Sequence, residues 1–173
     1  MNFEVIKTKI PGVIIIQPKC FIDDRGYFLE SYNKTSYKEI LPNINFVQDN
    51  ESQSSYGVLR GLHFQKEPFA QAKLVRVIKG EIQDVAIDIR PNSKTYKKYV
   101  SVVLNDENRK QLFIPKGFAH GFVVKSNKAI VSYKVNNYFN PEYDSGIKYN
   151  DTSINIKWSI PENEISLSKK DSK

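Results

Sequence analysis

Apolar and polar residues along the chain form many short segments that are separated by turn-forming residues. Apolar or alternating runs of strand length occupy residues 13–18, 99–105, 111–115, 120–126 and 129–139. Short runs rich in Val, Ile, Tyr and Phe and bounded by Gly, Pro, Asn or Asp are typical of β-strands. Many short strands with little helix predict an all-β protein, either a sandwich or a small barrel.

A longer segment, residues 72–90, reads "AKLVRVIKGEIQDVAIDIR". The Lys79-Gly80 pair in its middle predicts a hairpin in which the two arms pair with each other. In the second arm Val85, Ile87 and Ile89 alternate with Asp84, Ala86 and Asp88. We therefore expect this arm to have two unlike faces.

Other features set the boundaries of the fold. Residues 33–42 are the best helix candidate, because Asn33 can cap the start and Pro42 lies at the end. Residues 24–26 predict a turn that leads into an aromatic strand. We find no internal repeat or linker, so residues 1–173 are expected to form one domain. Its polar tail, from about residue 160, is expected to be loosely ordered.

Composition excludes several classes of protein. The hydrophobic content of 40% is sufficient for a core, and the single cysteine, Cys20, allows no internal disulfide. The charge of +7 comes from scattered lysines, and no nucleic-acid-binding motif is present. The start "MNFEVIKTKI" does not resemble a signal peptide, and no apolar run is long enough to span a bilayer. We expect a soluble cytoplasmic protein that binds neither nucleic acid nor membrane.

One of the two histidines lies in the strand-like segment "GVLRGLHFQ". Strand alternation places Arg60 and His63 on opposite faces unless the strand bends between them. Gly61 lies between them, and a glycine inside a strand often marks a bend or bulge. A bend would turn both polar side chains toward one cavity, whereas a straight edge strand would leave them in water. The spacing alone does not decide between these alternatives.

The second histidine, His120, lies in "FIPKGFAHGF", between apolar residues and two glycines. A single histidine in an apolar strand is usually structural. Metal binding would require a third ligand, and the chain has no H-x-H pair. Acid–base chemistry without a metal is therefore the better interpretation.

The segments "DDRGYFLES", "FVQDNESQSS", "GVLRGLHFQ", "QLFIPKGFAHGFVV" and "YKVNNYF" closely resemble the dTDP-4-dehydrorhamnose 3,5-epimerase family. The resemblance extends over almost the whole chain. It implies a cupin-like jelly-roll β-sandwich with one or two short helices. It also implies a nucleotide-sugar substrate, a homodimer that exchanges N-terminal strands, and no metal or cofactor.

The resemblance assigns a role to each matching residue. The catalytic group consists of His63 as base, Asp171 as its partner, Lys73 near the C4 oxygen, and Tyr133 as the acid on the opposite face of the sugar. Substrate contacts are assigned to His120 at the sugar, to Arg60, Gln48 and Asn50 at the nucleotide and pyrophosphate, and to Tyr138 against the base. Arg25 and Glu30 match a segment that reaches the partner's site. Asp144 stands where relatives often carry glutamate, and Tyr149 where tryptophan is common.

These residue types suit the implied reaction. The C–H bonds beside the carbonyl of a 4-keto sugar are acidic, at C3 and at C5. Inversion requires a base, a group that stabilises the enolate oxygen, and an acid on the other face. A histidine oriented by a carboxylate is a suitable base, and a lysine stabilises the enolate.

Several alternatives remain open at this stage. The substrate could carry GDP instead of dTDP, or a heptose, and one centre could be inverted instead of two. The chain could also be a non-catalytic sugar-binding cupin, a ketoisomerase or a metal-dependent dioxygenase. In isolation, Lys73 could be a surface lysine, Tyr133 and Tyr138 packing aromatics, and Asp171 a tail charge. The joint presence of His63, Lys73 and Tyr133 favours the 3,5-epimerase.

Overall fold

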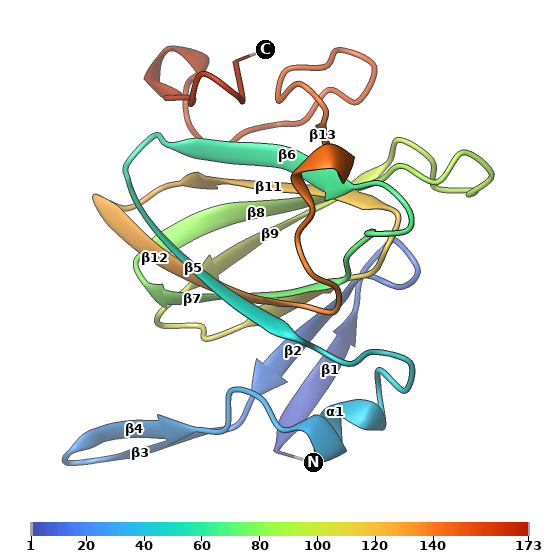
Figure 1. Ribbon diagram of the computed structural model, residues 1–173. Helices are drawn as coiled ribbons and strands as arrows, with labels where there is room; N and C mark the ends of the chain where they lie inside the picture. The colour runs from blue at the N-terminus through green and yellow to red at the C-terminus, as the bar shows by residue number, and fades with distance from the viewer. Residues whose placement is uncertain (1, 173) are drawn as a thin grey trace.

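Two antiparallel sheets face each other in the computed structural model, which describes residues 2–172 (Figure 1). The six-stranded sheet has the order β1-β2-β10-β7-β12-β5. Its strands are β1 (Phe3–Lys7), β2 (Ile14–Pro18), β10 (Gln111–Ile114), β7 (Lys73–Lys79), β12 (Lys128–Val135) and β5 (Gln48–Ser55). The five-stranded sheet has the order β13-β6-β11-β8-β9. Its strands are β13 (Asp144–Gly146), β6 (Leu59–Gln65), β11 (Phe118–Val124), β8 (Glu81–Asp88) and β9 (Tyr99–Asn105).

The main core lies between the two sheets. Val75, Leu112 and Val131 of the six-stranded sheet pack in one buried cluster with Ile82 and Phe122 of the five-stranded sheet. Helical structure is limited to α1 (Lys34–Lys38) and the 3₁₀ turns η1 (Pro141–Tyr143) and η2 (Glu162–Glu164) in the described part of the chain. The prediction of an all-β sandwich with little helix is confirmed.

The predicted hairpin at Lys79-Gly80 is wrong. The chain does turn at Gly80, but β7 pairs with β10 and β12, while β8 pairs with β11 and β9. The turn therefore carries the chain from one sheet to the other. Gly80 has φ +81, and a Cβ there would lie 2.1 Å from the carbonyl oxygen of Lys128. The glycine allows this tight corner, but the turn sequence alone does not show whether its arms pair.

The two faces of β8 are both buried, which the sequence pattern did not indicate. Ile82 and Ala86 face the core between the sheets. Val85 and Ile87 lie on the outer face, where Ile154 packs against them. Asp84 shares the inner face, since it alternates with Val85 and lies between Ile82 and Ala86. A charged side chain is thus placed inside the sandwich.

Local signals at the N-terminal half are confirmed. The Asn33 side chain caps α1 by accepting hydrogen bonds from the backbone N–H groups of Thr35 and Ser36. The turn at residues 24–26 joins β3 (Cys20–Asp23) to β4 (Gly26–Leu29), and this hairpin extends away from the two sheets (Figure 1).

The C-terminal segment lies over β6 at the top of Figure 1. Ser166 forms a parallel bridge with Val58, and Ile160 packs in a cluster with Leu59 and Val123. These contacts bring the end of the chain back to the sandwich. Within residues 2–172, none of the helices has the length and apolar character needed to span a bilayer.

Candidate active site

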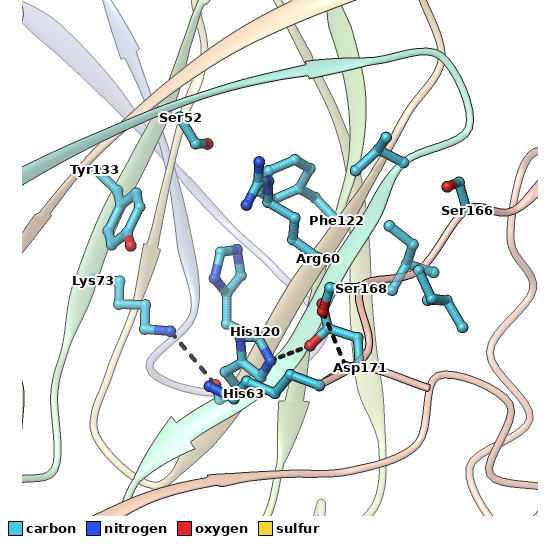
Figure 2. Close-up of a pocket in the computed structure, with 14 residues that line it drawn as sticks. Ser52, Arg60, His63, Lys73, His120, Phe122, Tyr133, Ser166, Ser168 and Asp171 are labelled. Atoms are coloured by element: carbon cyan, nitrogen blue, oxygen red, sulfur yellow. Dashed lines mark hydrogen bonds and ion pairs between the residues drawn. The ribbon is translucent and has the colours of Figure 1, made fainter. Parts of the chain in front are cut away.

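A cavity of about 470 Å³ opens between the two sheets. Its lining includes five predicted site residues from strands, Arg60, His63, Lys73, His120 and Tyr133, and Asp171 from the C-terminal segment (Figure 2). A second cavity of about 340 Å³ shares His63, Lys73 and Tyr133 with the first. The two cavities therefore meet at the proposed catalytic residues.

The expected bend at Gly61 is present as a bulge in β6. His63 is paired with His120 and Arg60 with Phe122, so β6 contains one more residue than β11 between these pairs. The extra residue places both Arg60 and His63 at the cavity. Gly61 has φ +119, and a Cβ there would lie 2.6 Å from the Cα of Gly121. Only glycine fits this close approach of two backbones.

His63 and Asp171 form a closely paired dyad. Nε2 of His63 lies 2.5 Å from Oδ1 of Asp171, and the Ser168 hydroxyl donates to Oδ2 of Asp171 at 2.9 Å (Figure 2). The Asp171 side chain is 5% exposed. Burial lowers the pKa of His63, and the Asp171 carboxylate opposes this effect. The imidazole is therefore neutral near pH 7 and can accept a proton.

Lys73 brings a cationic group into the same space. It projects from β7, and its Nζ donates to the backbone carbonyl of His63 at 3.5 Å. Burial lowers the pKa of Lys73 to about 8, against the attraction of the Asp84 and Asp144 carboxylates. The ammonium is thus charged at neutral pH with few compensating contacts, so it can stabilise a developing oxyanion.

Tyr133 faces the cavity from the sheet opposite to His63. It belongs to β12, whereas His63 belongs to β6. Burial raises the pKa of Tyr133, and Arg60 opposes this rise. The phenol remains protonated across the physiological range, as a proton donor must.

His120 forms a second pair with a carboxylate. Its Nε2 lies 2.6 Å from Oδ1 of Asp84, and both side chains are buried. Oδ2 of Asp84 has no hydrogen-bond partner within the described part of the chain. The unpartnered oxygen adds negative potential beside Lys73, because the Asp84 carboxylate attracts that ammonium group.

The predicted substrate-binding residues are only partly brought together. Gln48, Asn50 and Asp144 line the second cavity. The Arg60 guanidinium, at the first cavity, donates from Nε to the Ser54 hydroxyl at 2.9 Å. With His120, which also lines the first cavity, the structure gathers five of the predicted substrate contacts around the catalytic group.

The other predicted contacts lie away from the cavities in the single chain. Arg25, at the tip of the β3–β4 hairpin, is paired with Asp23, and its side chain is 90% exposed. Glu30 accepts a hydrogen bond from Asn33, and Tyr138 is exposed at the surface. Tyr149 lies outside both cavities, and its hydroxyl donates to Glu162.

Three residues at the site were missed from the sequence. Asp84 holds His120, Ser168 holds Asp171, and Lys170 forms an ion pair with Asp144. Asp84 had a signal, since an aspartate in an otherwise apolar strand requires a partner. Lys170 and Ser168 had none, because only folding brings the tail to the cavity. Among residues 2–172, no group of three or more His, Cys, Asp or Glu could hold a metal ion.

Comparison with known proteins identifies the family. The family model described as dTDP-4-dehydrorhamnose 3,5-epimerase matches residues 7–173. The chain belongs to the dTDP-4-dehydrorhamnose 3,5-epimerase family. The family resemblance seen in the sequence is confirmed.

Individual members of the 3,5-epimerase family are similar over most of their length. The enzyme of that name from Methanothermobacter thermautotrophicus is 54% identical over 159 residues, which cover 92% of this chain and 85% of the relative. The crystal structure of the enzyme from Elizabethkingia anophelis has a TM-score of 0.94 and 48% identity, with 99% and 94% of the two chains covered. These similarities confirm the cupin-like jelly roll and the assignment of the chain as an isomerase.

A liganded 3,5-epimerase is also similar. The crystal structure of the dTDP-6-deoxy-D-glucose-3,5-epimerase from Legionella pneumophila, in complex with dTDP-4-keto-L-rhamnose, has a TM-score of 0.95 and 46% identity. The match covers 98% of this chain and 90% of that structure.

Proposed function

We propose that this protein inverts C3 and C5 of dTDP-4-dehydro-6-deoxyglucose to give dTDP-4-dehydrorhamnose. One observation supports this most directly: a His–Asp dyad and a protonated tyrosine face one cavity from opposite sheets, with a buried lysine beside them. The similar Legionella enzyme is described with the product-like nucleotide sugar bound. A non-catalytic sugar-binding protein would not require this arrangement.

The first step is proton removal by His63. Asp171 accepts the Nε2–H of the neutral imidazole, so the lone pair is on Nδ1. Nδ1 takes the proton from C3 or C5, and the C–H electrons form the enolate with its charge on the C4 oxygen. The Lys73 ammonium stabilises this oxyanion, and Asp171 stabilises the imidazolium.

The second step is protonation from the other side. The Tyr133 hydroxyl donates its proton to the carbanionic carbon on the face opposite to His63, and the C4 carbonyl re-forms. His63 then carries the extra proton and Tyr133 is a phenolate, so a proton exchange through solvent restores both. The cycle runs once at each centre and consumes no cofactor.

The nucleotide end of the substrate is assigned to polar side chains around the cavity rim. Arg60 presents a guanidinium fork that suits the diphosphate. Gln48 and Asn50, which share a 2.8 Å hydrogen bond on β5, are placed to contact the nucleotide. Tyr138 would pack against the base from the exposed rim.

The proposal is tested by incubating the enzyme with dTDP-4-dehydro-6-deoxyglucose in D₂O and following C3 and C5 by NMR. The wild-type protein should incorporate deuterium at both carbons with inversion. His63→Ala should abolish exchange, whereas Tyr133→Phe should retain exchange without inverted product. Reversal of these two results would exchange the roles. A substrate linked to GDP, tested in parallel, decides the nucleobase, and deuterium at one carbon alone would indicate a single-centre enzyme.

We also propose a homodimer in which the β3–β4 hairpin packs on a second copy. The hairpin carries Phe21, Ile22, Tyr27 and Phe28, and Ile22 and Phe28 are 75% and 70% exposed. Such an exposed apolar arm is typical of an interface. Arg25 at its tip and Glu30 at its base would then complete the partner's cavity.

Mixed dimers test this arrangement. Arg25→Ala and His63→Ala should each be weakly active or inactive when pure. If Arg25 serves the partner's site, refolding the two variants together gives mixed dimers with one complete site and restores activity. A fully active monomer in light scattering, or no restoration of activity in verified mixed dimers, would contradict the proposal.

The location of the protein in the cytoplasm also remains a prediction.

A further inference from the structure

The last turn of the chain, residues 168–172, reaches the active site with little packing beneath it. As far as Leu167, the segment is attached to the sandwich by the Val58–Ser166 bridge and by a shared apolar cluster. Beyond that point, a cavity of about 280 Å³ is lined by Lys170 and Asp171 together with residues of β6 and β13. Apolar packing therefore does not fix the position of this turn.

Two ion pairs connect the turn to the rest of the described chain. Asp171 pairs with His63, and Lys170 pairs with Asp144. The other side-chain hydrogen bonds of residues 168–172 lie within the turn itself. Of the two ion pairs, the one made by Lys170 is independent of the proposed catalytic dyad.

Asp144 is a suitable anchor for the turn. It is the first residue of β13, and Gly146 of the same strand is paired with His63. The Asp144 side chain is 14% exposed, whereas that of Lys170 is 59% exposed. A carboxylate that is mostly buried requires a partner, and Lys170 supplies it. The ion pair thus ties the residue before Asp171 to the strand next to His63.

The position of Lys170 also suits a different role. Lys170 lines both catalytic cavities, and an ammonium group at such a place can attract a diphosphate. A lysine that moved to the substrate would, however, leave the mostly buried Asp144 carboxylate without its cation, which is unfavourable. The pairing with Asp144 therefore favours a role in holding the turn.

We propose that the Lys170–Asp144 ion pair is a clasp that holds the last turn at the active site and so keeps Asp171 in contact with His63. Lys170 is then a positioning residue, which acts on the reaction only through Asp171. The inference rests on the proposed function, because it requires His63 to be the base. Without the clasp, the turn leaves the site for part of the time, and His63 loses the carboxylate that orients it.

The test compares Lys170→Met, Lys170→Arg, Asp171→Asn and the double variant Lys170→Met/Asp171→Asn. Methionine removes the charge and keeps an unbranched apolar side chain, whereas arginine can still pair with a carboxylate. The measurements are kcat, KM and deuterium exchange at C3 and C5 with dTDP-4-dehydro-6-deoxyglucose, and dTDP binding by calorimetry. The clasp is tested through Lys170 because Asp144 also attracts the Lys73 ammonium, so replacing Asp144 would change two interactions.

For Lys170→Met we expect kcat and exchange to fall by about fivefold, which corresponds to the loss of a contact of about 1 kcal/mol. KM and dTDP affinity should stay close to those of the wild type, and Lys170→Arg should recover most of the lost activity. In the Asp171→Asn background, Lys170→Met should have little further effect, because two changes that remove the same contact are not additive.

Lys169→Met is the matched control. Lys169 carries the same charge in the same turn, but it lines none of the three cavities and forms no ion pair within the described part of the chain. Its replacement should leave kcat and exchange unchanged.

The outcomes are distinct. An unchanged kcat in Lys170→Met, or an equal fall in Lys169→Met, would overturn the clasp. A rise in KM with weaker dTDP binding would also overturn it, because Lys170 would then be a substrate contact, and so would effects of Lys170→Met and Asp171→Asn that multiply. Normal exchange in Asp171→Asn would refute the dyad and the clasp together. A wild-type enzyme that exchanges no deuterium with any 4-keto sugar nucleotide would refute the proposed function instead.

Discussion

Replacing Asp171 by asparagine tests the dyad with the smallest change in shape. The carboxylate lies 2.5 Å from Nε2 of His63 and is almost completely buried. Asparagine has nearly the same volume, but it lacks the charge and can present its NH₂ group to the imidazole. The His63 tautomer with a bare Nδ1 then loses its preference. We expect an enzyme that folds and binds dTDP but removes protons slowly.

The magnitude follows from the strength of the lost contact. A hydrogen bond to a charged group contributes about 1.5–3 kcal/mol, and one pKa unit corresponds to about 1.4 kcal/mol. Since Asp171 raises the pKa of His63 against burial, its removal should lower that pKa further and make the imidazole a weaker base. A general base contributes about 10²–10⁴-fold in rate. We therefore expect deuterium exchange to fall by about 10²-fold or more.

The assay is solvent exchange at C3 and C5 in D₂O as a function of pD, followed by NMR. The acid limb of the profile should move to lower pD, and the plateau should fall. Ser168→Ala is the matched control, because it removes a hydrogen bond to Oδ2 and leaves the charge. It should reduce exchange by less than about tenfold. An Asp171→Asn enzyme with an unchanged plateau and acid limb would refute the proposed dyad.

Three further outcomes are expected. The plot of kcat/KM against pH should be bell-shaped. Activity should fall at low pH, as His63 is protonated below its lowered pKa, and again above about pH 8, where Lys73 loses its proton. A profile that is flat from pH 7 to about 10 would show that the Lys73 charge is not needed. Gly61→Ala should lower the free energy of unfolding by at least about 1–3 kcal/mol, because the added Cβ would press on the Gly121 backbone. Gly26→Ala is the control: Gly26 has φ +125 but no atom within 4 Å of a Cβ, so its free energy of unfolding, measured by thermal denaturation, should fall less. Prolonged treatment with EDTA should leave activity intact, and a loss that a divalent cation restores would show a metal requirement.

The fold class was predictable because short-range sequence patterns agree with it. Turn residues separate strands of ordinary length, and Asn33 caps α1 as its sequence indicates. The sequence also suggested the bend at Gly61, because a glycine in the interior of a strand commonly marks a bulge or a close approach of two backbones. These features depend on residues close together in the chain.

Features that depend on distant partners were not predictable. The chain around Gly80 has the composition of a hairpin turn, yet its two arms belong to different sheets. The strand β5 has the sequence "QDNESQSS", with no apolar residue, and it forms only because β12 pairs with it along its whole length. Its polar side chains at Gln48 and Asn50 face a cavity instead of a core. Tertiary context outweighs β-propensity here.

The division of the site between two sheets has a stereochemical consequence. His63 reaches the cavity from β6 and Tyr133 from β12, so a sugar held between the sheets would have the proposed base on one face and the proposed acid on the other. Inversion at C3 and at C5 requires this opposition, whereas exchange with retention requires only the base. Apolar side chains of the main core pack between the sheets elsewhere, whereas at the cavity the Gly61 bulge and the strand β5 present polar side chains. The polar residues that conflict with a good hydrophobic core are therefore those that the proposed inversion requires.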